Sequence, residues 1–201
     1  MRPYDREIQR IIAGIRLIAL SICSCILPSQ MIFRLSQKLN TKIKAGTLGA
    51  QALHENPFAD WSAHLFSADR TQYIIICNTR SLYSTVMYAR GITNGNLFIT
   101  RALGGLREFM EDDGQEFIYT RLISPASTTV RFAKALDRSV TGSMNDLIYH
   151  ATMYLIEDEM APHNVGFKLN EIPFSALTYA NPRETFKSLV ATPVPDPTRN
   201  T

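Results

Sequence analysis

Cysteine is scarce in this chain, and its scarcity excludes two kinds of site. The 201 residues contain three cysteines: Cys23 and Cys25 near the N-terminus, and Cys77 inside the apolar run 73–78. Neither a disulfide framework nor a cysteine-based zinc site can be built from this number and spacing. A lone thiol in an apolar run is usually a small buried hydrophobic residue. The cysteine content therefore predicts a reducing, cytoplasmic location.

The sequence also lacks the short motifs that hold metals, nucleotides and nucleophiles. It contains no HxH, HxxE or DxD spacing, no GxxxxGK[ST] loop and no GxGxxG turn. Gly142-Ser143-Met144-Asn145 is not the GxSxG elbow of a serine hydrolase. His64 lies on a strand with Asp60 and Asp69 nearby, but nothing in the spacing makes these side chains converge. We therefore expect no metal site, no cofactor and no serine nucleophile.

Excess charge is small once the first thirty residues are set aside. The whole chain carries a formal charge of +3. Residues 1–30 hold four arginines against two acidic side chains, so the remainder has 17 basic and 16 acidic residues. Attraction to a phosphate backbone needs a clear basic excess. Nucleic acid is therefore not an expected partner, and a small basic patch around Lys134 and Arg138 is the one local exception.

Long apolar runs are absent as well. The longest uncharged stretch near the N-terminus is 17–27, before Pro28, and its eleven residues are too few to span a bilayer, which takes about 20. Three interpretations of residues 1–30 stay open: an over-extended reading frame with Met31 as the natural start, a buried or accessory helix, or a targeting segment. The composition break at Pro28 and the strand-like start at Met31 predict that residues 1–30 are dispensable to the fold, unless they form an integral core helix. No membrane segment is expected in 31–201.

Alternating apolar residues predict a meander of strands in the first half of the chain. Residues 31–39 alternate well enough for a first strand, and 40–60 have the composition of a loop. Trp61–Ser67 and Gln72–Asn78, joined by a turn at 68–71, predict a hairpin, and 82–89 predicts the next strand. Residues 128–136 are strand-like, whereas 115–124 fit helix or strand equally well.

Helices are predicted mainly in the second half. Asn94 caps a helix that ends near Asp113, and its Gly104-Gly105 pair suggests that something packs closely there. A second helix runs from Ser143 to about Glu159, with an apolar stripe at spacings of three and four. Asn181-Pro182 starts a short third helix. The prediction is an α+β domain over 31–190: an antiparallel sheet of four to five strands, two main helices, a short C-terminal helix, and a disordered tail at 191–201.

One polar segment before the second main helix is the candidate binding site. Gly142 is expected to form a sharp turn, with Ser143 as N-cap and Asp146 three residues later. Free backbone N–H groups at a helix start favour a carboxylate, a peptide backbone or a neutral polar group. The ligand-binding residues are predicted to be Arg138, Ser139, Thr141, Ser143 and Asn145.

Four stretches of sequence together resemble a known family. They are Met31-Ile-Phe-Arg with Gln-Lys-Leu39, then 61–66 followed by Asp69-Arg70, then Asn78 at a strand end, and finally 137–146. Over about residues 31–190 the chain resembles a bacterial family catalogued as a domain of unknown function, number 6933. The family begins where Met31 stands, which favours the over-extended reading frame. The resemblance implies no activity, cofactor or catalytic residue.

Two classes of function therefore stay open. The first is a non-catalytic cytoplasmic binding or interaction module that uses the polar segment 138–146 to hold a protein or a small polar ligand. The second is a small hydrolase-type enzyme using Asp146 and His150, which are four residues apart and so share one face of a helix. A pocket with both side chains converging on it would favour the enzyme, and a shallow polar surface would favour the module.

Overall fold

The computed structural model describes residues 30–136 and 138–190, with the backbone alone for 138–141 and 190. The predicted N-terminal extension and C-terminal tail lie outside these residues. Five strands form one sheet in the order β4-β3-β2-β1-β5. They are β1 (Met31–Leu35), β2 (Asp60–Ala68), β3 (Thr71–Asn78), β4 (Ser84–Tyr88) and β5 (Val130–Lys134). The number of strands and the α+β class agree with the sequence prediction.

The sheet is mixed, so the prediction of an antiparallel sheet was wrong in part. The predicted meander is real: β2 pairs antiparallel with β3, and β3 with β4. However, β1 lies parallel to both β2 and β5. Parallel neighbours need a long crossover, and the segment between β1 and β2 supplies it with helix α2 (Gln37–Ile43). The predicted strand 31–39 ends at Leu35 because Ser36 caps this helix, accepting a hydrogen bond from Leu39 N at 3.3 Å.

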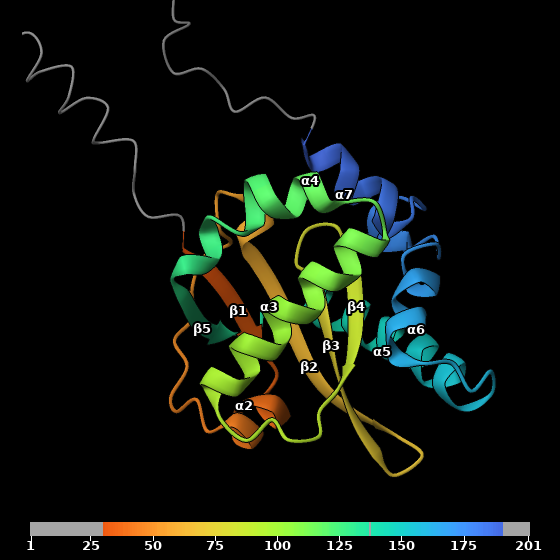
Figure 1. Cartoon of the computed structure of the whole chain (residues 1–201), viewed down its shortest axis with the longest axis horizontal. Coiled ribbons are helices and arrows are strands. Elements are labelled where there is room, and N and C mark those ends of the chain that lie inside the picture. The colour runs from red at the N-terminus through yellow and green to blue at the C-terminus, as the bar shows by residue number, and fades with distance from the viewer. Residues whose placement is uncertain (1–29, 137, 191–201) are drawn as a thin grey trace, which may run out of the picture.

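Helices cover both faces of the sheet, as Figure 1 shows. Helix α3 (Gly95–Asp112) crosses one face, α5 (Arg138–Ile156) lies behind the other, and α6 (Pro162–Leu169) lies alongside β4 at the end of the sheet. The remaining elements are α4 (Glu116–Ile118), a π-helical turn at Tyr119–Ile123, α7 (Pro182–Val190), and 3-10 turns at Pro57–Ala59, Ala126–Thr128 and Ser175–Leu177. The two predicted main helices and the short C-terminal helix are thus present, with α2, α4 and α6 in addition.

Alternation along the strands divides the apolar residues into two cores. Trp61 and Ala63 point toward α3, whose Phe98, Leu106 and Phe109 complete the first core. Phe66 points to the other face, where the stripe predicted for α5 contributes Met144, Leu147 and Ala151. Helix α7 joins the first core through Phe186, whose ring stacks on Tyr83 at 4.4 Å between centroids. Both cores are continuous with the sheet, which fixes the helices that flank it.

A fully buried ion pair ties β1 to β2. Arg34 Nε and Nη2 donate to the two carboxylate oxygens of Asp60, each at 2.7 Å, and both side chains are 0% exposed. Arg34 also donates to the carbonyls of Gln51 and Ala52, while Asp60 accepts from Thr79 Oγ1. Burial of a charge is tolerated only when its hydrogen bonds are made, as they are here. The pair therefore holds the 51–60 segment against the sheet.

Candidate functional site

Helix α5 begins earlier than the sequence predicts, which changes the environment of the polar segment. It starts at Arg138, so Ser143 is its sixth residue and is buried, with 8% of its surface exposed. The prediction of Ser143 as N-cap and of a turn at Gly142 was therefore wrong. Gly142 lies inside the helix, where a glycine costs only about 1 kcal/mol. Packing of Met144 and Leu147 on the sheet outweighs that cost.

The structure describes the side chains of only some of the other predicted site residues. Side chains of Arg138, Ser139 and Thr141 lie outside the described residues, so their roles stay predictions. Asn145 is exposed and lines a cleft beside β2. Asp146 is exposed, and His150 lies edge-on to the ring of Phe174 at 6.3 Å. Neither of these two side chains lines that cleft or the groove beside β4.

The feature that sequence reasoning missed is the outer edge of β4. This strand ends the sheet, so alternate residues turn their backbone groups away from β3. Ala89 N donates to Gln72 O and Asn78 N donates to Tyr83 O, which places the odd-numbered residues toward β3. The outward row is therefore Ser84, Val86 and Tyr88. Such a row is a template for another strand unless it is covered.

Helix α6 lies alongside this row and Val86 is buried, but among the described residues only the first position has hydrogen-bond partners for its backbone. Ser84 N donates to Asn170 Oδ1 at 2.8 Å, and Asn170 Nδ2 donates to Ser84 O at 2.9 Å. The buried side-chain amide of Asn170 therefore makes the two hydrogen bonds that the backbone of a neighbouring strand would make. Gly166 allows α6 to come this close, because a Cβ there would lie 3.2 Å from Ser84 O and 2.7 Å from the Phe109 ring. Within residues 30–136 and 138–190, no hydrogen bond reaches the outward backbone groups of Val86 and Tyr88.

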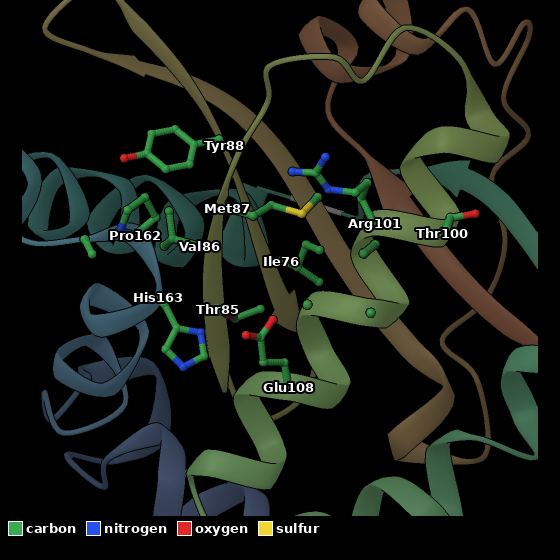
Figure 2. Close-up of a pocket in the computed structure, with 14 residues that line it drawn as sticks. Ile76, Thr85, Val86, Met87, Tyr88, Thr100, Arg101, Glu108, Pro162 and His163 are labelled. Carbon is green, nitrogen blue, oxygen red and sulfur yellow. The ribbon is translucent and has the colours of Figure 1, made fainter.

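A groove of about 530 Å³ is lined by Val86, Met87 and Tyr88 of this strand (Figure 2). Its floor is formed by β4 together with Ile76. One wall is α3, from Thr100 to Glu108, and the other is the start of α6 at Pro162 and His163. The Gly104-Gly105 pair lies in the α3 wall, and an added Cβ at either glycine would meet nothing within 4 Å. The prediction of close packing there was wrong: the glycines leave space.

Charged side chains stand at both ends of the groove. Arg101 and Glu108 project from α3 seven residues apart, which is about 10 Å along a helix. In Figure 2, Glu108 and His163 face each other across the groove. His163 Nε2 also lies 2.9 Å from Asp112 Oδ2. The Gly104-Gly105 pair was the only sequence signal for this groove, because the open strand edge depends on the order of strands in the sheet.

In the part of the chain that the structure describes, no group of three or more His, Cys, Asp or Glu side chains is placed to hold a metal ion. Among the same residues, no helix combines the length and apolarity needed to cross a bilayer. Burial raises the pKa of the Cys77 thiol to about 12, so this cysteine is a packed core residue and not a nucleophile.

Comparison with known proteins leaves one match. No curated protein and no solved structure matches this chain. A family model, described as a domain of unknown function (DUF6933), matches residues 32–185. The match runs from Ile32 in β1 to Thr185 in α7 and includes the Arg34–Asp60 pair, the β4 edge with Asn170, and both walls of the groove. On the extent of this match, the chain belongs to the DUF6933 family.

Proposed function

We propose that this domain is a non-catalytic interaction module that binds an extended segment of a partner protein by adding it to the outer edge of β4. The observation that carries the proposal is the pair of outward backbone positions, Val86 and Tyr88, in a groove with room for a chain. Peptides that add to a sheet edge gain affinity from main-chain hydrogen bonds and specificity from side-chain pockets. The backbone groups of Val86 and Tyr88 would supply the main-chain hydrogen bonds, and the groove walls would supply the side-chain pockets.

The groove favours a partner segment that carries both signs of charge. Arg101 at one end suits an acidic side chain, and Glu108 at the other suits a basic one. Between them the floor is apolar at Ile76 and Met87. About 10 Å separates the two charged ends, which an extended chain covers in three residues at about 3.3 Å each. We therefore expect an extended segment with an apolar centre and opposite charges flanking it.

Other parts of the proposal rest on the sequence. The polar segment of α5 stays a proposed second surface, with Asn145 exposed at its edge. A bacterial cytoplasmic setting is proposed from the family resemblance and from the cysteine content. The hydrolase alternative lacks a supporting observation, since Asp146 and His150 line neither of the two hollows.

The experiment selects peptides and then maps where they bind. Seven-residue peptides from a random display library would be selected on the purified chain, and the strongest would be titrated into isotope-labelled protein. We expect the amide resonances of Val86 and Tyr88 to shift and to become protected from exchange. A Gly104→Leu variant, whose new side chain would fill the groove, should lose at least tenfold in affinity. Arg107→Leu is the matched control, because this residue lies on α3 outside the groove lining.

Two results would contradict the proposal. The selected peptides could shift resonances on another surface, or they could bind Gly104→Leu as tightly as the unsubstituted chain. Either result would show that the β4 edge is not the binding site. Thermal unfolding of the variant separates this outcome from misfolding, because an added side chain at residue 104 has open space around it and the domain should remain folded.

A further inference from the structure

A second hollow lies between α2, the second half of β2 and α5, and its polar side chains are independent of the β4 edge. This cleft of about 820 Å³ is bounded by α2, β2 and the middle of α5. His64 lies on β2 within it, and Asn145 enters from α5. Because side chains alternate along a strand, His64 and Phe66 share the α5 face of the sheet. The cleft thus combines strand and helix side chains from distant parts of the sequence.

His64 is the observation that points to a ligand. The residue is only 8% exposed, yet among the described residues neither ring nitrogen has a hydrogen-bond partner. Neither nitrogen is among the fully buried unpaired atoms of the described residues, so the ring is open to the cleft and can bond a molecule from outside the chain. Desolvation lowers the pKa of His64 below its usual 6.5, which leaves the ring neutral at pH 7 with one donor and one acceptor nitrogen.

The remaining lining defines the chemistry of that partner. Among the described residues that line the cleft, Lys38 is the one charged side chain and none is acidic. Lys42 adds positive charge nearby, since its ammonium donates to the lining residue Gln72 at 2.8 Å. Phe66 and Ile148 supply apolar surface. A cation without an opposing carboxylate favours an anionic group, and the neutral His64 and apolar walls disfavour a highly charged one.

We infer that this cleft binds a small molecule that joins one carboxylate to an apolar body, with His64 and Asn145 as hydrogen-bonding partners and Lys38 as counter-charge. The inference goes beyond strand addition at β4 and does not depend on it. Asn145 was predicted from sequence as a ligand-binding residue, and in this cleft it lines the same space as His64 on β2.

The test uses benzoate as the probe and the histidines as reporters. The whole chain has four histidines, and of these only His64 lines the cleft. Benzoate titrated to 50 mM into isotope-labelled protein at pH 7 should shift the ring resonances of His64 and the side-chain amide of Asn145. His54 and His163 should stay in place. Lys38→Ala should weaken the apparent affinity at least fivefold, while Lys168→Ala, a lysine outside the cleft, should leave it unchanged.

Uncharged benzamide distinguishes the ligand class. It should shift His64 at least fivefold more weakly than benzoate at the same concentration. Equal binding of the two probes would overturn the assignment of a carboxylate, and equal shifts at all four histidines would show non-specific binding. Absence of any His64 shift with benzoate would overturn the site. Peptide binding at Val86 and Tyr88 is measured separately, so the two proposals can fail independently.

Discussion

The side chain of Asn170 and the backbone of Ser84 form two hydrogen bonds, 2.8 and 2.9 Å long, across 86 residues of sequence. A helix C-terminus thus supplies the pairing that a sixth strand would otherwise supply. It satisfies the backbone of β4 at one residue, while among the described residues the next two outward positions have no hydrogen-bond partner. The proposed function rests on those two positions.

Replacing Asn170 by Ala should destabilise the domain. The side chain is fully buried, and its loss leaves the N–H and C=O of Ser84 without partners, which we expect to lower the free energy of unfolding by about 2–3 kcal/mol. Urea denaturation measures the change. Asn96→Ala, at an exposed position on α3, should change stability by less than about 0.5 kcal/mol. A similarly small effect at residue 170 would show that the pairing contributes little.

Alanine should have opposite effects at two helical glycines. Gly104→Ala should raise the free energy of unfolding by about 0.5–1 kcal/mol, because the added methyl meets no neighbour and alanine favours the helix. Gly166→Ala should lower it, because its Cβ would lie 2.7 Å from the Phe109 ring. Both are measured by thermal and urea unfolding. Equal effects at the two positions would contradict the described packing.

The buried ion pair should show strong coupling. Arg34→Met leaves the Asp60 carboxylate buried without its cation, and we expect a loss of about 3–5 kcal/mol. The double variant Arg34→Met/Asp60→Leu removes both charges and should be more stable than Arg34→Met alone. A double-mutant cycle on urea unfolding gives the interaction energy. Additive effects of the two substitutions would argue against a direct pair.

His64 should make stability fall in mild acid. Its pKa is lowered in the folded protein by desolvation, so below about pH 6.5 the unfolded chain takes up a proton that the folded chain does not. The free energy of unfolding should therefore be constant above about pH 7. It should decrease as pH falls below 6.5, by at most about 1.4 kcal/mol per pH unit, until the folded-state pKa is reached.

Urea unfolding between pH 5.5 and 7.5 checks this dependence. His64→Gln should flatten the profile in that range, since glutamine does not titrate. His54→Gln, at a position that lines neither hollow, serves as the control and should keep the slope. A profile that is unchanged by His64→Gln would assign the pH dependence to other groups.

Local sequence determined most of the elements of this domain. Alternation fixed β2, β3 and β4 and assigned Trp61 and Phe66 to opposite faces, because side-chain direction has a period of two along a strand. Asn94 and Asn181 were correctly identified as caps, since each accepts a hydrogen bond from a backbone N–H three residues later. The apolar stripe of α5 was predicted as well, because apolar residues spaced three and four apart lie on one face of a helix.

Tertiary structure decided what local signals could not. The direction of β1, the open edge of β4 and its partial closure by Asn170 depend on which strands become neighbours, and no short segment specifies that. The start of α5 at Arg138 also departs from local signals, since it carries the helix through Gly142 despite a penalty of about 1 kcal/mol. The cleft of His64 and Asn145 likewise joins residues 81 positions apart, and only the folded chain brings them together.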